Sequence, residues 1–115
     1  MKFNISHEVQ QNICFVYFGG DLELTGIRKG EDYLRPLIYS PELDTFIIDL
    51  TEVDLISSSG VAFVTSVYKS IESREKKVGI CNIGPRHLKL FKLTKLDRFL
   101  KLFSSQQAAL DALKG

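Results

Sequence analysis

The run from Thr45 to Leu50, Thr-Phe-Ile-Ile-Asp-Leu, constrains the fold more than any other segment of the chain. It is almost continuously apolar, and after a polar loop it is followed by a strong helical pattern that starts near Val61. A strand is apolar at consecutive positions when both of its faces are buried, as in a parallel sheet covered by helices. The chain is therefore predicted to be an α/β protein.

The other segments alternate between strand-like and helix-like periods, beginning with a hairpin that turns near Asn12. Strands separated by helices indicate βαβ units. Residues 1–115 are thus predicted to form a single domain, a mixed, mostly parallel sheet of about five strands with four helices packed against it. The expected strands lie at 3–5, 13–18, 45–50, 78–83 and 99–103, and the expected helices at 27–38, 61–71, 85–91 and 104–113.

Four boundaries in this pattern depend on particular residues. Gly19-Gly20-Asp21 is expected to break the second strand, and 51–58 is expected to be a loop. Pro36 is expected to kink or end the first helix, because proline lacks an N–H and its ring crowds the preceding turn. Ser104 with Gln107 is typical of a capping box at the start of the last helix.

Composition and charge favour an ordinary soluble protein. The chain has 15 basic and 14 acidic residues mixed along the sequence, a net charge of +1 and 44% apolar residues. No clustered basic face of a nucleic-acid-binding protein is expected, since the Lys-rich stretch from Arg86 to Lys101 alternates with Leu and Phe like a solvated helix face. No apolar run approaches the roughly 20 residues of a membrane span.

Cys14 and Cys81 lie far apart and among apolar residues. They are predicted to be small buried side chains on strands rather than a disulfide or a metal pair, which favours a reducing compartment. The N-terminus opens directly into strand-like sequence without an apolar signal region. A cytoplasmic location is therefore expected.

No pattern of catalytic residues is present. His7 and His87 are the two histidines, neither in a recognisable motif, and the sequence lacks a nucleophile elbow, a Walker loop and a Cys-x-x-Cys pair. The nearby carboxylates Asp49, Glu52 and Asp54 are expected to be turn formers. The chain is predicted not to be an enzyme and to hold neither a metal nor a cofactor.

One cluster remains, Ser57-Ser58-Ser59-Gly60, between the buried strand and the strongest helix. A single serine there has an ordinary role, because its hydroxyl accepts from a free N–H at the helix start. Three adjacent serines are more than one cap requires. The segment is therefore the candidate functional site.

The whole pattern resembles the STAS domain, and most closely the anti-sigma-factor antagonists. In that family a strand ends in Asp-Leu-Ser/Thr and, after an apolar segment, Asp-Ser-Ser-Gly opens a helix. The resemblance covers essentially the full chain. The matching segments here are Asp49-Leu50-Thr51, Ser57-Ser58-Ser59-Gly60, Gly19-Gly20-Asp21-Leu22 (near the family's Gly-x-Leu-Asp) and Leu93-Thr94-Lys95-Leu96 (near the family's Leu-Thr-Gly-Leu).

The resemblance implies that a partner, both anti-sigma factor and serine kinase, binds this chain and is lost when Ser58 is phosphorylated. Ser57 and Ser59 are the second choices for the phosphate, and Ser59 is expected to cap the helix. Ser57 stands where the family usually has Asp. A serine phosphatase is a further expected partner. The implied partner-binding residues are Asp21, Ser57, Ser58, Ser59, Gly60 and Val61.

Two alternatives stay open. The first is a STAS interaction subunit without phosphorylation, inside a stress-sensing or lipid-transport assembly, which the serine at position 57 favours. The second is a small enzyme or nucleotide-binding domain that uses the same loop as a phosphate cradle. Such a cradle needs a glycine-rich loop and a lysine, whereas this loop has Gly60 and no basic residue between Ile47 and Lys69.

Overall fold

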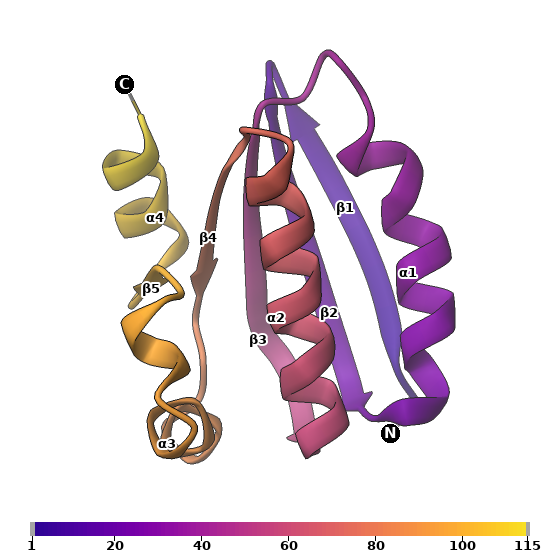
Figure 1. The fold of residues 1–115 in the computed structure, drawn as a ribbon, viewed down its shortest axis with the longest axis vertical. Coiled ribbons are helices and arrows are strands. Elements are labelled where there is room, and N and C mark those ends of the chain that lie inside the picture. The colour runs from indigo at the N-terminus through magenta and orange to yellow at the C-terminus, as the bar shows by residue number, and fades with distance from the viewer. Residues whose placement is uncertain (1, 115) are drawn as a thin grey trace.

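The computed structural model describes residues 2–114. Five strands form one sheet in the order β1-β2-β3-β4-β5, with β1 antiparallel to β2 and the other neighbours parallel. This architecture confirms the predicted mixed sheet with four helices (Figure 1). The elements are β1 Asn4–Gln10, β2 Ile13–Leu22, α1 Leu24–Ile38, β3 Thr45–Ile56, α2 Ser58–Ser73, β4 Lys77–Cys81, α3 Pro85–Leu93, the 3-10 helix η1 Leu96–Arg98, β5 Leu102–Phe103 and α4 Gln106–Leu113.

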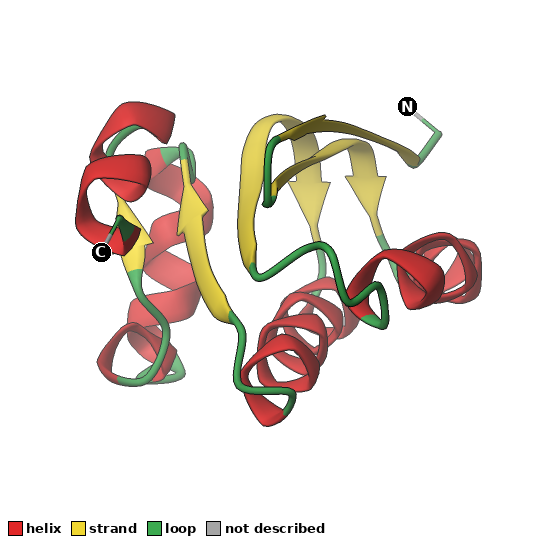
Figure 2. Cartoon of the chain, turned by 90° about the horizontal axis from the view of Figure 1, so that it is seen from above, coloured by secondary structure: helices red, strands yellow, loops and turns green. Residues whose placement is uncertain are grey.

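The sheet is covered on both faces, as the apolar run in β3 predicts. Alternate residues of β3 enter two separate cores, Phe46 and Ile48 on one side and Ile47 on the other. The larger core lies under α1, α2 and α3, and the smaller one lies under α4, which contributes Ala109 and Leu113. Figure 2 shows α4 alone on its side of the sheet.

β2 and β3 are both longer than predicted. β2 continues through Gly19 and Gly20 to Leu22, with two register shifts against β3 and a positive φ of 74° at Gly20. This extension gives the segment 51–56 a pairing partner, so that segment is strand and not the predicted loop. The glycines therefore produce irregular pairing rather than a strand end.

Pro36 lies inside α1, which ends two residues later, at Ile38. Because Pro36 has no N–H, the carbonyl of residue 32 loses its helical donor, and the helix continues for only two more residues. Lys76, which precedes β4, donates from Nζ to the carbonyl oxygens of Ile38 and Ser40 at 2.6 and 2.7 Å. The end of α1 is thereby tied to the start of β4.

The C-terminal third departs from prediction at two places. The expected strand at 99–103 shrinks to Leu102–Phe103, because η1 precedes it and Phe99 is 72% exposed. The cap of α4 is Ser105, whose Oγ accepts from the Ala108 N–H at 3.0 Å, rather than Ser104. The predicted apolar side of α4 is confirmed by the burial of Ala109 and Leu113.

Candidate functional site

The segment Ser57–Gly60 joins β3 to α2 at the end of the sheet to which the parallel strands point (Figure 1). Ser57 has an extended backbone, and its Oγ accepts from the Gly60 N–H at 3.1 Å. This bond is the N-cap of α2. The prediction that Ser59 caps the helix is therefore wrong, and the helix starts two residues before Gly60.

The start of α2 is pressed against the end of β2. The Leu22 carbonyl oxygen accepts from the Ser57 N–H at 3.2 Å and from the Ser57 hydroxyl at 3.4 Å. A Cβ on residue 60 would lie 2.2 Å from the same Leu22 oxygen. Glycine is required at position 60 because a backbone atom of another element occupies the space of a side chain.

The three serines differ in exposure. Ser58 is exposed, and its hydroxyl has no hydrogen-bond partner among residues 2–114, whereas Ser57 and Ser59 are half-buried. Gly60 and Val61 are buried, the latter 4% exposed, so they lie beneath the surface that Ser58 presents to solvent. Ser58 is therefore the serine that the fold presents to solvent.

Asp21, the remaining predicted site residue, lies near the end of β2 and is half-buried. Its register partner on β3 is Leu55, two residues before Ser57. The fold thus brings the Gly19–Leu22 segment and the serine loop together, although 36 positions separate Asp21 from Ser57 in the chain. This proximity follows from the parallel pairing of β2 with β3.

The loop can stabilise an anion at Ser58. The first N–H groups of a helix lack intrahelical acceptors. Ser57 satisfies the Gly60 N–H, and the amides of Ser58 and Ser59 have no acceptor within the described part of the chain. No acidic residue lies in the first turn of α2. The positive end of the helix dipole is therefore unopposed by a carboxylate in that turn.

Asp49, on β3, has a structural role within the sheet. It is 7% exposed, and its Oδ1 accepts from the Thr51 N–H at 2.9 Å and from the Thr51 hydroxyl at 2.5 Å. Its Oδ2 accepts from the Asn82 side-chain amide at 3.3 Å, just beyond β4. The prediction that Asp49, Glu52 and Asp54 form a turn is wrong, because all three lie within β3.

The hydrogen bonds of the two histidines are made to residues other than Ser58. His7 Nδ1 lies 2.5 Å from the Tyr33 hydroxyl, and His87 Nε2 lies 3.2 Å from the Asp54 carbonyl oxygen. The second contact ties α3 to the end of β3, a link that sequence reasoning missed because it joins residues 33 positions apart. Within residues 2–114 no group of three or more His, Cys, Asp or Glu is arranged to hold a metal ion.

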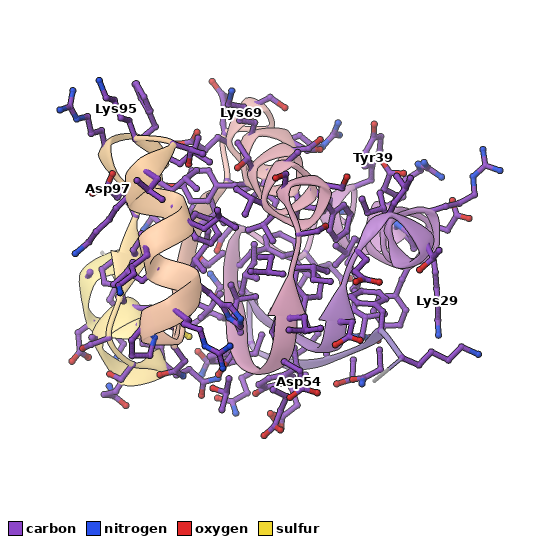
Figure 3. All side chains as sticks on the ribbon, turned by 90° about the horizontal axis from the view of Figure 1, so that it is seen from below. Lys29, Tyr39, Asp54, Lys69, Lys95 and Asp97 are labelled. Carbon is purple, nitrogen blue, oxygen red and sulfur yellow. The ribbon has the colours of Figure 1, made fainter. Side chains whose placement is uncertain are left out.

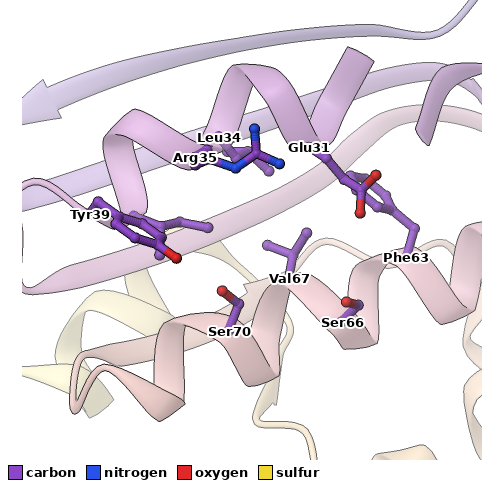
Figure 4. A pocket seen from close by; sticks show the side chains of 9 residues that line it. Glu31, Leu34, Arg35, Tyr39, Phe63, Ser66, Val67 and Ser70 are labelled. Carbon is purple, nitrogen blue, oxygen red and sulfur yellow. The ribbon is translucent and has the colours of Figure 1, made fainter. Parts of the chain in front are cut away.

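A separate cleft of about 130 Å³ lies between α1 and α2 (Figure 4). Leu34 and Val67 form apolar walls, and Glu31 and Arg35 lie along its α1 edge. No residue of the Ser57–Gly60 loop lines this cleft. It is therefore distinct from the candidate site.

Among the described residues, no helix has the length and apolar character of a transmembrane segment.

The chain is similar to anti-sigma factor antagonists in sequence and in fold. The anti-sigma-B factor antagonist of Staphylococcus aureus is 25% identical over 96 residues, covering 84% of this chain and 88% of that protein. An anti-sigma factor antagonist from Mycobacterium paratuberculosis superimposes with a TM-score of 0.88 at 20% identity, over 99% of this chain and 96% of the other.

The Bacillus cell fate determinant SpoIIAA, solved in its phosphorylated form, superimposes with a TM-score of 0.71 at 18% identity, over 98% of this chain and 100% of the other. At these identities the solved structures show a shared fold. The model of the STAS domain family matches residues 4–109, which is nearly the whole chain. This protein therefore belongs to the STAS domain family.

Proposed function

We propose that this chain is an anti-sigma factor antagonist, which binds an anti-sigma factor with serine kinase activity and is switched off by phosphorylation of Ser58. The observation that carries the proposal is the exposed hydroxyl of Ser58 at the first residue of α2, which has no hydrogen-bond partner among the described residues. The similarity to named antagonists, one of them solved in a phosphorylated form, supports it. The proposal places the chain in the cytoplasm, where a serine phosphatase restores binding.

The serine at position 57, where the family usually has Asp, is compatible with this switch. Serine and aspartate are comparably good N-caps, and Ser57 makes the capping bond to the Gly60 N–H. A neutral cap also adds no repulsion to a phosphate on the next residue. The geometry of the loop is therefore kept without the family's carboxylate.

Phosphorylation at Ser58 leaves the fold intact. A phosphoserine adds a charge of about −1.5 to −2 and three acceptor oxygens. Those oxygens meet the N–H groups of Ser58 and Ser59, which lack acceptors within residues 2–114, at the positive end of α2. Such a placement stabilises by about 0.3–1 kcal/mol. The domain then has no need to rearrange.

The partner surface is affected instead. A protein docked over Ser58 has to desolvate or exclude the dianion, and a loss of about 4 kcal/mol weakens binding about a thousandfold. Binding is thereby switched by local charge and steric exclusion, without a large conformational change.

Calorimetric titration with the anti-sigma factor kinase of the same host tests the switch. We expect Ser58→Ala to bind like the unmodified chain and Ser58→Asp to bind at least about tenfold more weakly, because a fixed charge at the loop opposes docking. Ser104→Asp, at an exposed serine before α4, is the matched control and should bind normally. Equal affinities for the two Ser58 variants contradict the proposal.

Mass spectrometry after incubation with that kinase and ATP identifies the acceptor. One phosphate on Ser58 is expected, since Ser57 is engaged as the cap and Ser59 is half-buried. A chain that binds the kinase but takes up no phosphate on Ser57, Ser58 or Ser59 supports the alternative, a STAS interaction subunit without phosphorylation.

A further inference from the structure

The charges of this chain are not evenly mixed. Residues 86–101 contain six basic side chains and one acidic side chain, a net charge of +5. The other residues contain nine basic and thirteen acidic side chains, a net charge of −4. The expectation of mixed charges therefore fails for the segment that forms α3, η1 and the approach to β5.

The basic side chains of α3 are available to a partner. Arg86, Lys89 and Lys92 are exposed, on the side of the helix away from the buried Phe91. None of the three lies within ion-pair distance of a carboxylate in the part of the chain that the structure describes. Leu93, beside them, is 79% exposed. The helix α3 therefore presents a cationic surface from which one apolar side chain, that of Leu93, protrudes.

A groove separates this helix from the end of β3. Its volume is about 290 Å³, and it is lined by Leu55 and Ile56 at the end of β3 and by α3 residues that include Arg86, Lys89 and Leu93. Leu55 is 51% exposed, so Leu55 and Leu93 are both open to solvent. The His87 contact to the Asp54 carbonyl oxygen joins the two elements. The groove is therefore bounded by two elements that are held together.

The β3 side of the groove is apolar, and one carboxylate lies next to it in the chain. Asp54 is exposed on β3, next to Leu55, whereas Glu52 lines a separate hollow with Tyr17 and Asp49. Figure 3, which looks at this end of the molecule from below, shows Asp54 at the edge formed by the end of β3, apart from the helix α3. The groove is thus bordered by the basic side chains of α3, the basic half of this surface, and by Asp54 at the end of β3.

We propose that this groove binds an acidic segment of the protein partner that docks at Ser58, with an apolar side chain of that segment seated between Leu55 and Leu93. The inference rests on the proposed function, whose binding surface it extends from the serine loop to α3. Carboxylates of the segment pair with Arg86, Lys89 and Lys92. A basic group of the same partner faces Asp54.

The arrangement of charge around the groove favours a protein partner over a nucleic acid or an anionic membrane. A nucleic acid or an anionic membrane is attracted by the basic half but repelled by Asp54 and by the net negative charge of the rest of the chain. A folded partner can place acidic groups against the basic half and a basic group against Asp54, which fixes its orientation and speeds its association. The apolar groove then supplies the anchor that charge alone does not provide.

Association and dissociation rates with the purified anti-sigma factor kinase, measured by biolayer interferometry at low and high salt, test the inference. Lys89→Glu with Lys92→Glu should reduce affinity at least about tenfold at low salt, mainly through slower association, and less at high salt. Leu93→Ala should reduce it several-fold through faster dissociation, at either salt concentration.

Two control variants carry the same kinds of change elsewhere. Arg28→Glu with Lys29→Glu reverses the same number of charges on α1, and Figure 3 shows Lys29 on the other side of the molecule from α3. Val9→Ala removes another exposed apolar side chain, on β1. Both controls should bind within about twofold of the unmodified chain, because rim charges and scattered apolar residues outside the contact contribute little.

The outcomes separate the groove from the phosphorylation switch. Normal binding of the α3 and Leu93 variants overturns the groove, even if Ser58→Asp still abolishes binding. Weakened binding of those variants supports the groove, even if Ser58 proves not to be phosphorylated. Unchanged kinase binding with a loss of affinity for phosphatidylglycerol vesicles or duplex DNA assigns the basic half to a polyanion and overturns the inference.

Discussion

At the scale of single residues, the Leu22 carbonyl oxygen sets the geometry of the serine loop. It accepts from both the backbone and the side chain of Ser57, and it lies where a Cβ of residue 60 would be. The serine hydroxyl in turn caps α2 at Gly60. One oxygen of β2 therefore determines which residue begins the helix, and hence that Ser58 is turned to solvent.

Replacing Gly60 by Ala is expected to destabilise the protein by about 1–3 kcal/mol. The added methyl group collides with the Leu22 carbonyl oxygen, a backbone atom that cannot rotate away as a side chain could. Urea denaturation followed by circular dichroism measures the change. Gly84→Ala is the control: a Cβ there meets His87 Nδ1 at 3.8 Å, an ordinary contact. A Gly60 variant as stable as the Gly84 variant contradicts the close approach.

At the scale of elements, the ends of helices are joined to strands by single side chains. Lys76 donates to two carbonyl oxygens at the end of α1, and Lys77 donates from Nζ to the Leu113 carbonyl oxygen at 3.0 Å, at the end of α4. Helix ends have carbonyl groups without intrahelical donors. Cations at these positions satisfy them and also oppose the negative end of the helix dipole.

Lys76→Met is expected to destabilise the protein by about 1–3 kcal/mol, because two carbonyl oxygens lose a charged donor while the apolar stem of the side chain is retained. Partial burial lowers the pKa of Lys76, and the nearby charge of Arg74 adds to the shift. Lys69→Met, at an exposed lysine of α2, is the control and should be nearly neutral. Equal thermal midpoints for the two variants contradict the link between α1 and β4.

At the scale of the whole molecule, the sheet separates two cores and places one thiol in each. Cys14 lies in the core under α1 and α2, and Cys81 in the core under α4. Burial raises the pKa of Cys14 to about 11 and that of Cys81 to about 12, with the Asp49 carboxylate adding to the shift of Cys81. Both thiols are free and buried, as predicted.

These thiols predict how stability depends on alkaline pH. The folded state retains both protons above pH 9.0, the ordinary thiol pKa, while the unfolded state loses them. The stabilising contribution is complete below about pH 9 and is lost as pH rises towards 11 and 12. The free energy of unfolding should therefore fall over this window, and less so in a Cys14→Ala, Cys81→Ala variant.

Urea titrations at pH 8 and pH 10 measure that difference, and labelling with a thiol reagent at pH 8 provides an independent check. The native chain should react far more slowly than the urea-unfolded chain, because the thiolate is the reactive form and both thiols are buried. Rapid labelling of the native chain contradicts the burial of the two cysteines.

The sequence by itself determined the fold class, the two-sided burial of β3 and the place of the serine loop. Those features depend on the local spacing of apolar residues and on residue type, both of which can be seen in the sequence. The loop was found because its serines follow a buried strand and precede the strongest helix. The exposure of Ser58, in contrast, depends on the cap that Ser57 makes and on the position of Leu22.

The tertiary structure decided the element boundaries and the surface around the site. β3 runs to Ile56 because the end of β2 lies beside it, although Gly19 and Gly20 indicate a break. The groove beside Ser58 exists because α3 packs next to the end of β3, a contact between segments far apart in the chain. Such features depend on pairing between distant segments, which no local pattern of residues specifies.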